Sequence, residues 1–317
     1  MASTRAQEML EPACGGDGGT GTVIEDLPAD VLGLVLRRLD GASLAAMGCA
    51  CSGFRDLAND PVAWRALCLE TWPSTRDIVC RGGGGYQALY ADAFPFPAAS
   101  SSPAVLPSSL PVPARLVSAV DLHHNGVCVM SRVVETDASS AWFLGSPFRI
   151  DALVQEGFSA PSPIAPDELT LSWILIDPAT GAALNASSRR PVSVDRTWLS
   201  GDAVVRFTVV LGGGVALDAA VTCDHRHGHV REVSLCAGDA EGGGVSGQDG
   251  LAAVAAAMAS ARQRRGAEEA ARQVYEEFAK GKERKERKAK REGVIDLWCS
   301  GVGAVAFLAC LVMLTFR

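Results

Sequence analysis

Several features common in enzymes and in nucleic-acid-binding proteins are scarce in this chain. Aromatic residues make up only 6% of the 317 residues, histidine occurs five times, and the ten cysteines form no CxxC pair. The formal net charge is −7, whereas general nucleic-acid binders are usually basic. We therefore expect no nucleic-acid partner, and we expect the scattered cysteines to be reduced thiols, several of them in the core.

Catalytic motifs are absent as well. The sequence contains no Ser/His/Asp order, nucleophile elbow or P-loop, and its glycine runs lack the strand–GxGxxG–helix context of a dinucleotide site. Acidic pairs at 135–137 and 167–168 are interpreted as solvated loop carboxylates rather than as an acid/base pair. The sequence thus predicts a chain without catalytic residues and without a cofactor.

The strongest metal-ligand pattern lies in the segment from Cys223 to His229. The period of two of a strand would place Cys223, His225, His227 and His229 on one face, and these residue types bind zinc. However, four such residues would spread over about 20 Å, while structural zinc gathers its ligands from separated segments. A polar hairpin tip explains the segment more simply, so no metal site is predicted.

The N-terminal part is rich in apolar residues at helical spacing. Residues 1–22 are polar and glycine-rich, are expected to be disordered, and hold no apolar run typical of a secretory signal peptide. From Leu27 onward, large aliphatic residues recur every three or four positions and predict a helix with a wide apolar stripe. Pro28 suits the first helical position, and Asp30 suits the first turn.

Two more helix starts follow this first helix. Gly41 is placed to end it, and a second helix begins at residues 41–43. Asn59-Asp60-Pro61 signals a third helix, which carries Trp64. Three helices in residues 23–72 make a domain near the lower limit of independent stability. Its apolar surface is therefore expected to be covered, either by another protein or by a larger core of the same chain.

Residues 24–72 resemble the F-box. The resemblance rests on residues that occur in the order and register of that motif: Leu27-Pro28, Asp30, Leu32, Val35-Leu36, Leu39, Leu44, Cys49, Phe54-Arg55, Leu57, Pro61 and Trp64. The common Val-x-Lys-x-Trp stretch is replaced at 50–54, where Phe54 keeps the aromatic bulk. Members of that family dock on the Skp adaptor of cullin–RING ubiquitin ligases. The resemblance therefore implies a Skp-binding set of residues: Leu27, Pro28, Val31, Leu32, Val35, Leu36, Leu39, Leu44 and Trp64.

Residues 73–114 are predicted to be a loop followed by a Pro/Ser-rich linker. Arg81–Gly85 is a glycine-rich turn, and a short helix is expected near Tyr86–Phe94. The following stretch is rich in Pro, Ser and Ala and cannot bury enough apolar surface to order itself.

Residues 115–240 change to the period of β-strands. Asn125-Gly126 lies between two β-rich runs and predicts a hairpin, with His123-His124 as exposed residues beside its turn. Alternate apolar residues from Leu169 to Leu175 share one face of another strand, and three more strands are expected between 203 and 236. Strands joined by turns favour an antiparallel sandwich or open barrel, so the fold class is α+β.

Sequence blocks in this region are similar to a subgroup of plant F-box proteins with a β-rich region and a hydrophobic C-terminus: DLHHNG, VVET, WFLGSPFRID, LTLSWILIDP and REVSL. That resemblance implies a substrate-recognition domain at 115–240, without a defined ligand. Arg189, Arg190 and Arg196, near Trp198, can recognise a phosphate or an acidic group, or simply stabilise the surface. Together with Trp173, they support an alternative in which this domain binds a glycan or a lipid headgroup.

The C-terminal part combines a basic helix with a long apolar run. Residues 250–293 favour a helix, and 280–291 contain eight basic residues and two glutamates. Residues 297–316 carry no charge and would span about 30 Å as a helix, the thickness of a hydrocarbon core. We expect 294–317 to be a transmembrane tail anchor with the preceding chain in the cytosol, at the endoplasmic reticulum rather than the outer mitochondrial membrane. A buried C-terminal core helix is the alternative.

Together these features predict a membrane-tethered, non-catalytic subunit of an SCF-type (Skp–cullin–F-box) ubiquitin ligase. Its expected partners are the Skp adaptor, a cullin–RING ligase through that adaptor, and an unknown protein substrate that is recruited for ubiquitination. An adaptor that binds Skp at a membrane without promoting degradation is the nearest alternative.

Overall fold

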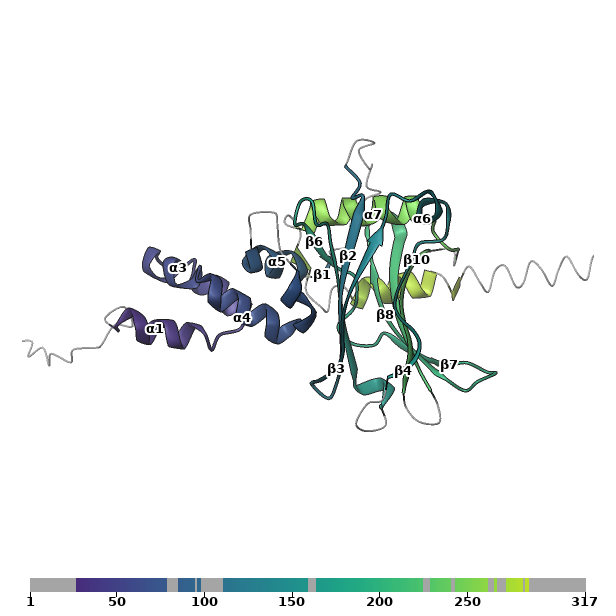
Figure 1. Cartoon of the computed structure of the whole chain (residues 1–317), viewed down its shortest axis with the longest axis horizontal. Coiled ribbons are helices and arrows are strands. Elements are labelled where there is room, and N and C mark those ends of the chain that lie inside the picture. Colours follow the sequence, from purple (N-terminus) through teal and green to yellow (C-terminus); the bar gives the residue numbers. More distant parts are fainter. Residues whose placement is uncertain are drawn as a thin grey trace, which may run out of the picture. The chain divides into compact units, whose positions relative to one another are not determined.

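A computed structural model of the chain describes residues 27–78, 85–94, 96–97, 111–158, 164–224, 229–240, 243–261, 265–266, 272–281 and 283–284 (Figure 1). The chain divides into two compact units, residues 1–58 and 59–317. The predicted disordered segment 1–22, most of the Pro/Ser-rich linker and the predicted transmembrane segment 294–317 lie outside the described residues. Among the helices that are described, none is long and apolar enough to cross a membrane.

The described part of the first unit contains three helices, with these bounds: α1 Ala29–Leu36, α2 Gly41–Met47 and α3 Ser52–Ala58. The Asp40 carboxylate caps α2, because its Oδ1 accepts a hydrogen bond of 2.7 Å from the Ser43 N–H. Pro28 lies one residue before α1 rather than at its first position, and its carbonyl accepts the first helical N–H groups. Gly41 opens α2 rather than ending α1, since Asp40 provides the cap.

The helix α3 was not predicted from the sequence, and the described F-box region therefore has four helices instead of the expected three. Gly53 and Ser52 open α3 and favour helices weakly, which hid the helix in the sequence. The Phe54 side chain of α3 is buried and supplies the aromatic bulk expected at this position. The start signalled by Asn59-Asp60-Pro61 is confirmed, because α4 runs from Pro61 to Thr71 with Asp60 as its cap.

The second unit begins with helices that share an aromatic cluster. The helix α4 is followed by the short 3₁₀ helix η2, Pro73–Asp77, and by α5, Gly85–Ala93. The Tyr90 ring lies 5.4 Å from that of Trp64 and 5.5 Å from that of Trp72, measured between centroids. These contacts join α4 and α5, and α5 confirms the short helix expected near Tyr86–Phe94.

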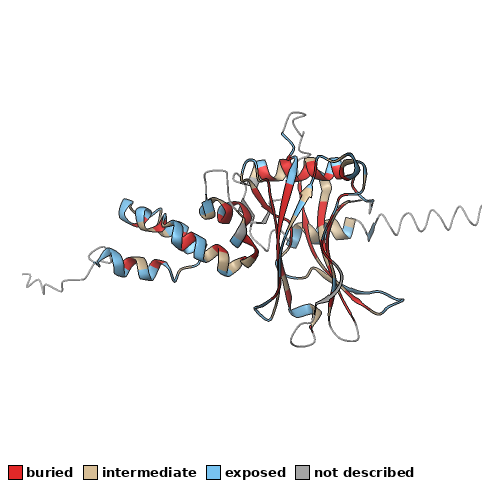
Figure 2. Cartoon of the chain, in the orientation of Figure 1, coloured by how far each residue is buried: buried red, intermediate tan, exposed pale blue. Residues whose placement is uncertain are grey.

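Two antiparallel sheets form most of the second unit. The four-stranded sheet has the order β3-β2-β5-β6, with β2 Arg115–His124, β3 Val127–Asp137, β5 Leu169–Ile176 and β6 Ala183–Asn185. The five-stranded sheet has the order β4-β10-β9-β8-β7, with β4 Arg149–Phe158, β7 Ser193–Arg196, β8 Ala203–Val210, β9 Val215–Cys223 and β10 Val230–Asp239. One buried apolar cluster contains residues of both sheets, so the architecture is a sandwich rather than an open barrel (Figure 2).

The strand pattern in the sequence is confirmed at several points. Asn125 and Gly126 form the turn between β2 and β3 with φ angles of 51° and 78°, as an Asn-Gly hairpin requires. In β5, Leu169, Leu171 and Trp173 alternate with less buried residues and face the core. The three strands expected between 203 and 236 are β8, β9 and β10.

Helices close one end of the sandwich. The helix α7, Gly247–Ala261, lies crosswise to the strands in Figure 1, and its Leu251, Val254 and Met258 belong to the core cluster. It packs against α6, Ala141–Gly145, which follows β3. The remaining elements of the described chain are η3 Pro166–Glu168, η4 Gly212–Gly214, the short pair β1 Phe96–Pro97 with β11 Arg265–Gly266, and a helix at 272–281.

A buried carboxylate connects η2 to the four-stranded sheet. Asp121 of β2 is fully buried, and its oxygens accept hydrogen bonds from the Ser74 N–H at 3.0 Å and the Ser74 hydroxyl at 2.5 Å. The Ser131 hydroxyl of β3 donates a third bond at 2.6 Å. Burial raises the pKa of Asp121, and the hydrogen bonds from Ser131 and Ser74 oppose this effect. The segment after α4 is therefore attached to the β-sandwich through a specific polar contact.

Candidate partner-binding surfaces

One side of α1 presents large aliphatic side chains to solvent. Leu27, Val31, Leu34 and Val35 are all exposed, and Leu34 retains 64% of its accessible area. Val31, Leu34 and Val35 share a stripe of the helix, since Leu34 and Val35 follow Val31 by three and four residues, and Leu27 lies just before the helix. We call these four residues the α1 surface. An exposed stripe of this kind on a small helical unit is typical of a protein-binding site.

The other predicted Skp-binding residues have different positions. Leu32, Leu36 and Leu44 are buried inside the first unit, and Leu39 is half-buried. Trp64 is buried in the second unit beside Tyr90. The buried residues hold the helices together. The accessible members of the predicted set are Leu27, Pro28, Val31 and Val35. The assignment of the whole set to Skp binding stays a prediction.

Leu34 was missed as a candidate, although it is the most exposed member of the α1 surface. The motif places its fixed aliphatic positions at Leu32, Val35 and Leu36, and Leu34 falls between them. Helical geometry alone would have included it, because Leu34 follows Val31 by three positions.

The loops at one end of the β-sandwich form a second candidate surface. The hairpin between β7 and β8 carries Trp198 and Leu199 at its tip, with 90% and 82% of their areas exposed. Figure 1 shows β7 projecting from the end of the sandwich opposite α7. Arg189, Arg190 and Arg196 of the basic–aromatic cluster are exposed along the same segment. Trp173 is fully buried, so Trp198 is the accessible member of the two tryptophans considered for glycan or lipid binding.

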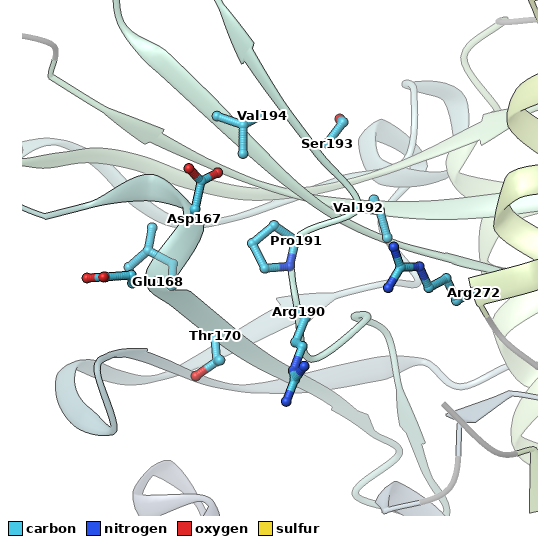
Figure 3. Close-up of a pocket in the computed structure, with 10 residues that line it drawn as sticks. Asp167, Glu168, Thr170, Arg190, Pro191, Val192, Ser193, Val194 and Arg272 are labelled. Atoms are coloured by element: carbon cyan, nitrogen blue, oxygen red, sulfur yellow. The ribbon is translucent and has the colours of Figure 1, made fainter. Parts of the chain in front are cut away.

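A cavity of about 560 Å³ lies beside this segment (Figure 3). One wall comes from η3 and the start of β5 and includes Asp167 and Glu168, and the other comes from residues 190–194. Arg272, from the helix at 272–281, also lines it. The walls are polar and open, and they bring charges of both signs together.

Both carboxylates of the acidic pair at 167–168 are exposed, as expected, but Glu168 also contacts the β2–β3 turn. Glu168 Oε2 accepts a hydrogen bond of 2.8 Å from the Asn125 amide and lies 3.3 Å from His124 Nε2. His124 Nε2 in turn accepts the Ala165 N–H at 3.3 Å, so this histidine is half-buried rather than exposed as expected. These contacts tie the β2–β3 turn to η3, which gives the carboxylate and the imidazole a structural role.

The Cys223–His229 segment is described only in part. Cys223 is buried at the end of β9, and burial raises the pKa of its thiol to about 11. His225 and His227 lie outside the described residues, and within those that are described no group of His, Cys, Asp or Glu is arranged to hold a metal ion. The thiol of Cys223 is therefore protonated at neutral pH and acts as a core residue.

A second cavity, of about 370 Å³, lies between the helix at 272–281 and the outer face of the five-stranded sheet. Tyr275 and Phe278 face strands that carry an ion-pair network of Arg206 with Asp218 and Asp195. Burial raises the pKa of Tyr275, and the nearby Asp218 carboxylate acts in the same direction. This helix thus covers a charged part of the sheet with its apolar side.

Comparisons with known proteins agree with the helical motif and extend beyond it. Residues 24–70 match the F-box-like family. Three Arabidopsis thaliana relatives are named as F-box proteins. At2g36090 is 38% identical, over 89% of this chain and 90% of its own length. At3g44326 is 32% identical over 92% and 89%, and At2g27310 is 33% identical over 91% and 95%.

Proposed function

Because the chain belongs to the F-box proteins, we propose that it is the substrate-recognition subunit of a Skp–cullin–F-box ubiquitin ligase. In this role the α1 surface binds the Skp adaptor, and the β-sandwich binds a target protein. The chain contributes no catalytic residue, since holding the target near the charged conjugating enzyme raises the effective concentration of its lysines.

The observation that carries the proposal is the exposure of the α1 surface within the F-box match. Leu32 and Leu36 fill the interior of the first unit, while Val31, Leu34 and Val35 leave a contiguous apolar stripe uncovered within the described residues. Burying three such side chains in an interface contributes several kcal/mol, at about 1.5–3 kcal/mol for each. An adaptor with a complementary apolar groove would gain this free energy.

Affinity capture of the full chain tests the adaptor role. We expect Val31→Ala combined with Leu34→Ala and Val35→Ala to reduce capture of the Skp adaptor at least tenfold, because interface hot spots cost about 1–2 kcal/mol each. Val133→Ala removes the same kind of exposed side chain from β3 and serves as the control. It should leave capture unchanged.

Capture of cullin distinguishes a ligase subunit from an adaptor that works outside any ligase. Capture of both Skp and cullin by the wild type supports the ligase, whereas capture of Skp without cullin would favour a non-degradative adaptor. If the wild type captured neither, or if the triple variant captured Skp as well as the Val133→Ala control does, the proposal would be wrong.

We further propose that residues 297–316 anchor the protein in a membrane with the F-box in the cytosol. Support comes from the uncharged twenty-residue run and the basic stretch before it. The endoplasmic reticulum is favoured over the outer mitochondrial membrane. Alkaline carbonate extraction should leave the full chain in the membrane pellet, and replacing Val305 and Leu308 by arginine should release it. Extraction of the wild type would refute the anchor, and fractionation would identify the membrane.

A further inference from the structure

Among the described residues, β7 ends the five-stranded sheet, and one of its edges pairs with no strand. Within the described residues its one strand neighbour is β8, with Val194 opposite Val205 and Arg196 opposite Ala203. The hairpin bond runs from the Thr197 N–H to the Asp202 carbonyl at 2.9 Å. Because bonded pairs alternate along an antiparallel ladder, the N–H and C=O groups of Val194 and Arg196 point away from β8. Such an edge can pair with an extended peptide.

The side chains along this edge form a surface that can contact the side chains of an added peptide strand. Val194 lines the cavity of Figure 3, and Arg196, two residues further on, points to the same side of the strand. Trp198 and Leu199 follow at the hairpin tip and are almost fully exposed. A side chain of a bound peptide can enter the cavity, and another can pack on the tryptophan.

The charges on this surface favour an acidic peptide. Arg190 and Arg196 are exposed, and no ion pair involves either of them within the part of the chain that the structure describes. Glu168, on the far wall, is already bound by Asn125. Asp195 points to the other side of β7 and lies 3.6 Å from Arg206. Asp167 adds a negative charge to the far wall of the cavity and would repel an acidic side chain there. The acidic residues of a ligand are therefore expected beside Arg190 and Arg196.

We propose that an extended acidic peptide segment of the target protein adds as a strand to the edge of β7, with an apolar side chain against Trp198 and Leu199. This inference rests on the proposed function only in assigning the peptide to a ubiquitination target. Main-chain hydrogen bonds to Val194 and Arg196 supply the pairing, and Arg190 and Arg196 select the charge.

Binding of the full chain to immobilised peptides tests this proposal. The probes are short peptides that share one alternating Thr/Val pattern with a single tryptophan and carry glutamate, glutamine or lysine at the same positions. The glutamate set should bind at least about tenfold more tightly than the lysine set, because like charges across an interface are unfavourable. Arg196→Glu should reverse this preference.

Two substitutions at Val194 distinguish the contribution of its backbone N–H to peptide binding from that of its side chain. Val194→Pro removes the outward N–H, which β8 does not use, and proline is tolerated at such an edge position. It should weaken binding of the glutamate peptides about tenfold. Val194→Ala keeps the N–H and should bind nearly as the wild type does. Equal melting temperatures of the two variants would show that both are folded.

Three results would overturn the proposal. The first is equal peptide binding by Val194→Pro and Val194→Ala, and the second is no preference of the wild type for the glutamate set. The third is a wild-type dimer that Val194→Pro converts to a monomer in analytical ultracentrifugation, since a second copy would then occupy the edge. Skp capture is measured on the same samples, so that loss of the ligase role is recognised separately from loss of peptide binding.

Discussion

Asp121 is the residue through which η2 is bonded to the β-sandwich. A carboxylate at this position is removed from water, and three donors from Ser74 and Ser131 compensate for the lost hydration. Replacement by alanine would leave the N–H and the hydroxyl of the buried Ser74 without their acceptor, whereas the hydroxyl of the exposed Ser131 can bond to water. Such groups cost about 1–3 kcal/mol each when they are buried without a partner.

Asp121→Ala is therefore expected to lower the free energy of unfolding by about 2–3 kcal/mol, and Asp121→Asn by less, since the amide can still accept one bond. The pH dependence is a sharper test. The pKa of Asp121 is raised from 3.8, so the native state binds more protons between the two pKa values. The free energy of unfolding of the wild type should fall, relative to Asp121→Asn, as the pH rises from 3.8 through the native pKa.

Urea titrations of the two proteins over this pH range measure the effect. A difference that stayed constant with pH would contradict a raised pKa for Asp121.

The buried thiols should be protected from alkylation. Cys223 has a pKa of about 11 and is buried, and Cys68 is buried as well, whereas Cys49 is exposed. Under native conditions at pH 8, iodoacetamide should modify Cys49 long before Cys223 or Cys68, because the thiolate is the reactive form. Mass spectrometry of peptides from timed samples measures the order, and rapid labelling of Cys223 would mean that the end of β9 opens.

Among the elements, α7 depends on close backbone contacts at two glycines. A Cβ at Gly247 would overlap with the carbonyl oxygen of Phe143, and a Cβ at Gly250 would lie 2.7 Å from the Phe148 ring. Neither glycine needs an unusual φ angle, so their role is to let α7 closely approach α6 and Phe148, the residue before β4.

Gly247→Ala should destabilise the second unit by about 1–3 kcal/mol, since the backbone of α6 would have to move. Gly145→Ala is the control, because a Cβ there meets no atom within 4 Å. Thermal unfolding measures the melting temperatures of both variants. A melting temperature of Gly247→Ala equal to that of the control would show that α7 shifts without cost.

Elements with a strong local pattern were predictable, and those defined by long-range contacts were not. The β2–β3 hairpin follows from Asn125-Gly126, and β5 follows from alternating apolar residues. In contrast, α3 contains Ser52 and Gly53 and is held by burial of Phe54. Likewise, the sequence marked Trp198 as part of a basic–aromatic cluster, but the free edge of β7 depends on strand order, which no local pattern encodes.

At the scale of the whole molecule, the β-sandwich extends beyond its strands. Residues 115–240 were expected to form the domain, but α7 contributes Leu251, Val254 and Met258 to the core. Removing α7 would expose these contacts, and each buried side chain contributes about 1.5–3 kcal/mol. The total approaches the entire stability of a typical domain.

A fragment of residues 115–240 should therefore be a loosely packed species that binds the dye ANS, whereas residues 59–284 should unfold cooperatively. Residues 59–240 form the matched fragment that lacks α7 while retaining η2. Circular dichroism and dye fluorescence compare the three. Cooperative unfolding of 59–240 at the melting temperature of 59–284 would mean that α7 adds nothing to the core.

The segment that matches the F-box-like family ends at residue 70, but α4 belongs to the second unit and shares the Tyr90 cluster with α5. The recognisable motif and the folding unit thus have different boundaries. A transplant of this motif onto another protein, cut after Trp72, would lose the ring that packs against both tryptophans. Exchange of recognition domains by recombination would therefore need a junction near residue 59 or beyond Phe94. The segment that matches the family would not fold as an independent domain.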